Sequence, residues 1–335
     1  MRFDEQKKQS IILYLLDKID KKEKSPVQST VSAFNINKTT VYSYIDELCE
    51  NKVIKKLGRG SYELITNTAQ YKFSRSAGDL DSDTYIFYNC FEKFIKELPS
   101  NVYQIWIHAF SEMVNNVMDH SMAENVSIHI EQNILRTAVS IADNGIGIFK
   151  KIKDHFGYAT LDDAICELFK GKLTTDTENH SGEGIFFSSK MMDRFFIYSD
   201  GKIFNTNKYQ DSDIKNFDGS FKGTIVFMEL SNHINKQTSD IFDMYADVVG
   251  GFKKTKIVLK NIFETSPVSR SQAKRVCNRL DEFEEVIFDF EGIEWMGQGF
   301  AHQIFSVFAS AHPEIRITAV NMAENVLKMY NHVTQ

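Results

Sequence analysis

Polar side chains gather within three turns of one otherwise apolar segment, "FSEMVNNVMDHS", which runs from Phe110 to Ser121. Carboxylate, amide and imidazole groups of this kind can bind cations and move protons. At about 100° per residue, the segment predicts a helix with two stripes. The apolar stripe consists of Trp106, Phe110, Met113 and Val117, and the polar one of Glu112, Asn116 and Asp119. Taken alone, the polar stripe is best explained as a solvated helix face, the usual place of charged residues on an amphipathic helix.

Two glycine pairs follow this helix and give its polar stripe a second meaning. Two strand-like runs, "NVSIHIEQ" and "LRTAVSIA", lead into "DNGIGIF", where Gly145 and Gly147 permit positive φ and close backbone approach to a ligand. Asp143 supplies a carboxylate acceptor at the end of the second strand. Further on, "HSGEGIFF" places Gly182 and Gly184 at the start of an apolar helix, whose first amides can hold phosphate oxygens. Each pair alone is weak evidence, but the order and spacing of all three elements indicate a nucleotide site.

Residues 83–231 resemble the ATPase domain of the GHKL superfamily, which includes gyrase, the histidine kinases, MutL and the anti-sigma-factor serine kinases. The Glu-x-x-x-Asn box of that family matches Glu112 and Asn116. Its other boxes match Asp143, Gly145 and Gly147, then Gly182 and Gly184, and finally the strand "KGTIVFMEL" with Thr224. The resemblance implies a left-handed αβ sandwich, the Bergerat-type ATP fold, with ATP and Mg²⁺ between the helices and the sheet.

The residue types assign separate roles within the implied ATP site. Asn116 offers an amide oxygen to Mg²⁺, which prefers oxygen ligands and retains waters. Glu112 lies one turn earlier, where its carboxylate could orient or deprotonate a nucleophile that attacks the γ-phosphate. Asp143 would accept a hydrogen bond from the adenine amino group, with Thr224 beside it.

Residues 150–181 correspond to the mobile ATP lid of the family. Within them we expect phosphate contacts from Lys172, Thr174, Thr175 and His180. His120 ends the polar helix, where two roles stay open: a neighbour of the phosphates, or a charge at the helix C-terminus. A metal site built from histidines is not expected, because neither His-x-x-x-His nor His-Glu-x-x-His spacing occurs.

Residues 1–65 form a basic head on an acidic chain. They contain twelve Lys or Arg against nine Asp or Glu, a net charge of +3, whereas the whole chain carries −6. Their apolar spacing predicts three helices and a hairpin, an order that resembles a winged helix-turn-helix domain. The side chains expected to meet DNA are Lys38, Thr39, Thr40, Tyr42, Ser43 and Tyr44 on the third helix, and Lys55, Lys56 and Arg59 on the wing. The alternative is a winged helix that makes only protein contacts.

The remaining segments complete an α+β multidomain protein. Residues 66–82 are polar and without a sustained period, which predicts a linker, and residues 232–252 are expected to connect to the last unit. Residues 253–335 alternate strands and helices and resemble a STAS-like α/β domain, akin to the anti-sigma-factor antagonists. In those relatives a serine at the start of one helix is phosphorylated, but "MGQGF", Met296 to Phe300, has no hydroxyl there.

Composition limits the setting and the function classes. Four widely spaced cysteines argue against disulfides and Cys-based metal sites, and no apolar run is long enough to span a bilayer, so we expect a cytoplasmic protein. Two hypotheses remain. In the first, ATP binding and slow hydrolysis switch DNA binding, dimerisation or a protein partner of the STAS-like tail. In the second, the chain is a serine/threonine protein kinase of the anti-sigma type that acts on a separate protein. Either hypothesis implies a weak Mg²⁺-dependent ATPase or a kinase.

Overall fold

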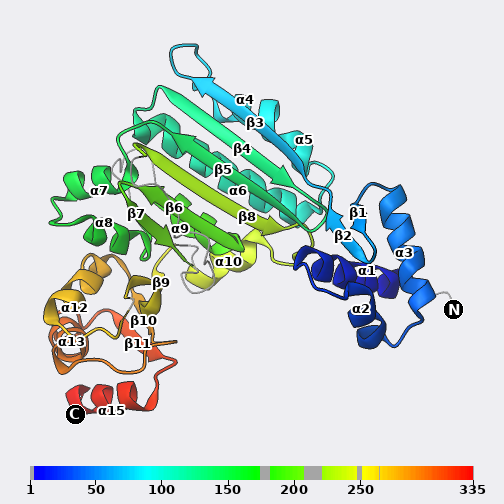
Figure 1. Ribbon diagram of the computed structural model, residues 1–335. Helices are drawn as coiled ribbons and strands as arrows, with labels where there is room; N and C mark the ends of the chain where they lie inside the picture. The colour runs from blue at the N-terminus through cyan, green and yellow to red at the C-terminus, as the bar shows by residue number, and fades with distance from the viewer. Residues whose placement is uncertain (1–3, 174–181, 207–220, 247–250, 264, 335) are drawn as a thin grey trace.

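The computed structural model describes residues 4–173, 182–206, 221–246, 251–263 and 265–334. Figure 1 shows a large central sheet. The N-terminal helices lie at one end of its strands, and the C-terminal α/β unit lies below it. Among the described helices, none is long and apolar enough to cross a membrane.

The N-terminal unit has the predicted order of three helices and a hairpin. The helices are α1 (Glu5–Asp20), α2 (Pro26–Phe34) and α3 (Lys38–Glu50), and the strands are β1 (Ile54–Gly58) and β2 (Ser61–Leu64). Pro26 stands in the first turn of α2, where its missing N–H costs nothing. A separate small core holds the unit together, with Ile11, Leu15, Val41 and Ile45 among its members. The unit therefore packs around its own centre.

Six strands form the central sheet, in the order β3-β4-β5-β8-β6-β7, and every pairing is antiparallel. Their bounds are β3 (Asn67–Ser74), β4 (Asn125–Gln132), β5 (Arg136–Asp143), β6 (Arg194–Ser199), β7 (Lys202–Asn205) and β8 (Thr224–Ser231). Alternate residues such as Val126, Ile128 and Ile130 are buried, as the period of a strand requires when one face is covered. The covering layer is helical (Figure 1).

That layer contains the helix predicted from the opening segment. Its members are α4 (Asp83–Ile86), η1 (Phe87–Phe91), α5 (Glu92–Ile95), α6 (Ser100–Asn116), η2 (Val117–Ser121), α9 (Gly184–Met191) and α10 (Thr238–Tyr245). The predicted apolar stripe is confirmed, because Trp106, Phe110 and Met113 on α6 are buried. The helix continues without a break into the π-helical turn η2.

The linker predicted over residues 66–82 is wrong for its first half. Residues 67–74 form β3, which pairs with the whole of β4 at the edge of the sheet. Phe73 is buried and Tyr71 packs on the same core, whereas Lys72 between them is exposed. Ala69, Tyr71 and Phe73 alternate with polar residues, which is the period of a half-buried strand, but the alternation is short and lies in a segment that is otherwise polar.

The expected lid is also largely regular structure. Within residues 150–181, α7 (Ile148–Phe156) and α8 (Leu161–Leu168) are helices that bury Ile152, Ala164 and Leu168. Residues 174–181, with the predicted contacts Thr174, Thr175 and His180, lie outside the described residues.

The C-terminal unit has three parallel strands, in the order β11-β10-β9, with helices between them. Its elements are β9 (Lys254–Val258), α11 (Leu259–Ile262), α12 (Arg270–Cys277), η4 (Leu280–Glu282), β10 (Glu285–Asp289), α13 (Gln298–His302), η5 (Gln303–Phe308), α14 (Ala309–Ala311), β11 (Arg316–Val320) and α15 (Glu324–Thr334). The predicted alternation of strands and helices is confirmed. One continuous hydrophobic cluster runs from Phe73 to Val326, so the sheet domain and the C-terminal unit share a core.

Candidate functional site

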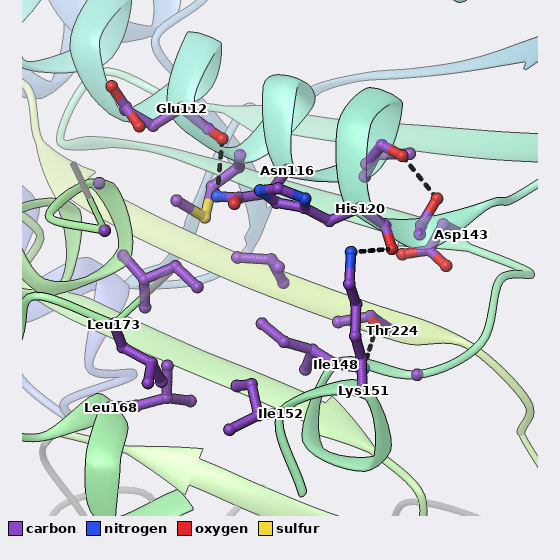
Figure 2. Close-up of a pocket in the computed structure, with 18 of the residues that line it drawn as sticks. Glu112, Asn116, His120, Asp143, Ile148, Lys151, Ile152, Leu168, Leu173 and Thr224 are labelled. Carbon is purple, nitrogen blue, oxygen red and sulfur yellow. Dashed lines mark hydrogen bonds between the residues drawn. The ribbon is translucent and has the colours of Figure 1, made fainter. Parts of the chain in front are cut away.

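A cavity of about 240 Å³ lies where α6 and η2 face the ends of β5 and β8 (Figure 2). Since a water takes up roughly 30 Å³ of liquid, the cavity has room for a small molecule rather than a few waters. Much of its wall is apolar: Met113, Val117, Ile146, Ile148, Ile152, Leu168, Leu173, Ile185, Phe186 and Val226. A few polar groups set among such walls are the usual composition of a ligand site.

Asp143 forms a polar corner of the cavity at the end of β5. Its side chain is only 4% exposed, and its Oδ1 accepts a hydrogen bond of 2.8 Å from the Gly145 N–H. Burial raises the pKa of this carboxyl, against the lowering effect of backbone N–H donors from Gly145 and Thr224. Thr224 is the cross-strand partner of Asp143, and its hydroxyl accepts from the Ile148 N–H at 3.1 Å. The corner thus presents a fixed acceptor.

Asn116 and Glu112 lie along the helix that closes the cavity from above in Figure 2. Asn116 Nδ2 donates to the Glu112 carbonyl at 2.8 Å, so the amide is held in one orientation and Oδ1 remains as its acceptor. The Glu112 carboxylate lies in front of Gly184, where a Cβ atom would overlap Oε2. Gly184, the first residue of α9, thus leaves free the space that the Glu112 carboxylate occupies.

Gly147, Gly182 and Gly184 line the cavity, and the glycine pairs also make room for protein atoms. A Cβ at Gly145 would overlap the backbone of Ser121, and one at Gly147 would lie 2.6 Å from the Asp200 carboxylate. Gly147 and Gly182 also adopt positive φ, of 82° and 72°. Because these glycines have no side chain, η2, α7 and residue 173 can pack closely around the cavity.

The structure brings together most of the residues predicted for the site. Those that line the cavity are Glu112, Asn116, His120, Asp143, Gly147, Gly182, Gly184 and Thr224. Gly145 stands behind Asp143 as its hydrogen-bond donor. Lys172 does not line the cavity: its Nζ donates to the Glu282 carbonyl at 2.6 Å, in the C-terminal unit, and contacts the Phe283 ring. The predicted phosphate contact of Lys172 is thus not formed here.

Lys151 is a cavity residue that the sequence did not single out. It lies on α7, one turn after Gly147, and its Nζ donates to the His120 carbonyl at 3.0 Å. Figure 2 shows this side chain crossing the cavity toward the end of the polar helix. The sequence does contain a signal for this position. Lys151 follows Gly147 by one helical turn, and residues four apart lie on one helix face.

The side chains predicted to meet DNA lie mostly on the surface. Lys38, Thr39, Tyr42 and Ser43 are exposed on α3, and Lys55, Lys56 and Arg59 on the hairpin. Lys55 is paired with Glu63 at 2.8 Å. Tyr44 is a correction: it is buried in the core of the N-terminal unit and cannot reach a partner.

Comparison with known families covers the two larger parts of the chain. Residues 102–232 match the family model of the histidine kinase-, DNA gyrase B- and HSP90-like ATPases. Residues 272–327 match a STAS-like domain of unknown function, DUF4325. Neither of these two models extends over the N-terminal unit. Among curated proteins, no sequence matches the chain. A GHKL-type ATPase domain joined to a STAS-like domain fits an ATP-dependent regulator.

Proposed function

We propose that this chain is an ATP-binding regulator in which nucleotide binding, followed by slow hydrolysis, controls DNA binding by the N-terminal unit and protein contacts of the STAS-like unit. The proposal rests on one cavity with largely apolar walls. On its wall, Asp143 can accept a hydrogen bond from adenine and Asn116 can bind a cation. Both residues lie within the part of the chain that matches the ATPase family model.

Adenine fits the corner formed by Asp143 and Thr224. The carboxylate, held by the Gly145 N–H, would accept a hydrogen bond from the exocyclic amino group, and the apolar wall would cover the ring. Guanine would present a carbonyl oxygen at that position, opposite a carboxylate. The corner therefore selects ATP over GTP.

The other polar groups suit a triphosphate with Mg²⁺. Among the described residues, no three His, Cys, Asp or Glu side chains cluster as metal ligands, so a cation here depends on phosphate oxygens in addition to Asn116 Oδ1. When bound, Mg²⁺ would neutralise charge on the β- and γ-phosphates. Glu112 would then position or deprotonate the attacking water, and Lys151 adds a positive charge beside His120.

DNA binding is proposed for the N-terminal unit because its exposed basic and polar side chains gather on α3 and the hairpin. Contacts of Lys55 and Arg59 with phosphates would make the affinity fall with salt. A cytoplasmic setting belongs to the proposal, since all four cysteines are free thiols.

The test follows γ-labelled Mg-ATP and a fluorescent random-sequence DNA duplex in the presence of the full chain. We expect label to be released as free phosphate, and the affinity for the duplex to differ between ATP and ADP. Label retained on an added protein would support the kinase alternative instead. If the chain binds no ATP, the proposal fails.

Two variants separate binding from turnover in the same assay. Glu112→Ala should bind ATP but lose phosphate release, whereas Asp143→Asn should bind ATP more weakly. Asp119→Asn is the matched control, because Asp119 is exposed on the same helix and does not line the cavity. Equal loss of binding in the Glu112 and Asp143 variants contradicts the roles assigned to them.

A further inference from the structure

One short segment, residues 167–173, lines the cavity on one side and contacts the C-terminal unit on the other. Leu168, Gly171 and Leu173 line the cavity. The side chains of Glu167, Lys170 and Lys172 point the other way and contact the C-terminal unit. Figure 1 shows α8 directly beside α12, and the contacts fall in α12 and just after it, at Arg275, Asn278 and Glu282. The cavity wall is therefore also the junction between two domains.

Lys170 is the centre of this junction. Its side chain is 1% exposed, and Nζ contacts Glu167 Oε1 at 2.7 Å, the Asn278 carbonyl at 2.6 Å and the Arg275 carbonyl at 3.0 Å. The ammonium thus satisfies carbonyls at the C-terminal end of α12, where a positive charge is favourable. On the backbone side, the Thr255 hydroxyl donates to the Lys170 carbonyl at 2.7 Å.

Arg279 reaches back from the C-terminal unit into the cavity wall. Its Nη2 donates to the Lys172 carbonyl at 2.7 Å, and its Nη1 lies 3.6 Å from Glu167 Oε2. Asn278 Nδ2 donates to the other oxygen of Glu167 at 3.1 Å. Glu167, itself 2% exposed, is consequently held by groups from both domains. Removal of one partner from such a buried set leaves a charge without compensation.

Aromatic rings make a second, independent connection. Phe186 of α9 lines the cavity and packs 5.0 Å from Phe252, whose ring lies 5.5 Å from Phe283 of the C-terminal unit. Gly171 has φ of 88°, and a Cβ there would lie 2.6 Å from the Phe252 ring. The same stretch of wall is therefore packed against the C-terminal unit by both polar and apolar contacts.

We propose that Arg279 is a positioning residue for the nucleotide site, supplied by the STAS-like domain, and that nucleotide binding and the posture of this domain are linked through residues 167–173. The inference rests on the proposed function, in that it takes ATP as the ligand of the cavity. By reciprocity, a protein that binds the STAS-like domain and shifts α12 changes the affinity for ATP, and ATP changes the affinity for that protein by the same factor.

The first experiment measures ATP affinity calorimetrically with the full chain. Arg279→Ala should bind ATP about 5- to 20-fold more weakly than the wild type, within the usual range of coupling between sites. Arg316→Ala is the matched control, because Arg316 is an exposed arginine on β11 of the same domain, and its affinity should be unchanged. Arg279→Lys keeps a positive charge opposite Glu167 but loses the fork that reaches Lys172, so it should fold and bind several-fold more weakly.

The second readout reports the C-terminal unit itself. The chain has two tryptophans, and Trp295 in that unit is 49% exposed, whereas Trp106 is buried in α6. In a Trp106→Phe background, iodide quenching of Trp295 should change when ATP is added, and Arg279→Ala should abolish the change at saturating ATP. A role for Arg279 in stability alone would leave this response intact.

The outcomes separate the two proposals. If the wild type binds no ATP, the proposed function is wrong. If it binds ATP while both Arg279 variants bind equally well and Trp295 responds as before, the cavity is a nucleotide site but the link through Arg279 is overturned.

Discussion

At the scale of single residues, Asp143 is buried, whereas the adenine contact proposed for it needs its charged form. Burial raises the pKa of its carboxyl, so the charged form is disfavoured relative to the unfolded chain. The stability of the ligand-free protein therefore decreases as pH rises from the ordinary aspartate pKa through the raised value. An adenine amino group has the opposite preference, because it donates to the carboxylate.

ATP affinity should accordingly fall as pH is lowered through the raised pKa of Asp143. In Asp143→Asn the amide cannot ionise, and its single oxygen must serve both the Gly145 N–H and the adenine amino group. Since a hydrogen bond to a charged group is worth about 1.5–3 kcal/mol, we expect binding roughly 10- to 150-fold weaker. Calorimetric titration at several pH values checks this. A pH profile that the variant shares with the wild type would rule out Asp143 as its source.

Gly184 lies against the Glu112 carboxylate, for which we propose a role in hydrolysis. In Gly184→Ala the new Cβ overlaps only the far end of the flexible Glu112 side chain, which can rotate away. We expect thermal stability to change by less than about 1 kcal/mol, since an Ala replaces Gly at a helix start, while phosphate release is largely lost. Melting curves and phosphate assays on one sample decide it. Normal turnover would mean that the observed Glu112 position is not the active one.

At the scale of elements, a helix or strand can be predicted from the sequence when its buried positions repeat over enough residues to form a clear pattern. The apolar stripe of α6 could be predicted because a helix covering a sheet repeats its buried positions. β3 carries a weaker signal, because the alternation of Tyr71 and Phe73 with polar residues is short and leads into a polar segment. The charge of Lys172 near the second glycine pair predicts a phosphate contact, but its partner, Glu282, lies over a hundred residues away in the chain, where local spacing gives no signal.

β3 should be as necessary to the sheet as its inner neighbours. Phe73, paired with Val126 on β4 and 8% exposed, anchors the strand. Phe73→Ala should destabilise the chain by about 3 kcal/mol, the lower end of the range for buried phenylalanines. The exposed neighbour Lys72→Ala should stay within about 0.5 kcal/mol of the wild type in urea unfolding. If Phe73→Ala and Lys72→Ala unfold at similar urea concentrations, β3 does not contribute to the stability of the sheet.

At the scale of the whole molecule, the two junctions of the sheet domain differ in kind. The C-terminal unit shares one hydrophobic cluster with the sheet and is tied to it by Lys170 and Glu167. The N-terminal unit has a separate core, which Leu135 at the end of the sheet touches from outside, and the ion pair of Arg136 with Asp20 adds a polar contact there. A shared core predicts joint unfolding, and a separate core predicts independence.

Heating should therefore produce two transitions, one for the N-terminal unit and one for the sheet and C-terminal unit together. Both tryptophans, Trp106 and Trp295, lie in the second group, so fluorescence should report one transition while circular dichroism reports both. ATP at about 100 times its Kd should stabilise only the fluorescent transition, by about 2.7 kcal/mol. If the two tryptophans unfold separately in single-tryptophan variants, the shared core does not act as one cooperative unit, and coupling through residues 167–173 would lose its mechanical basis.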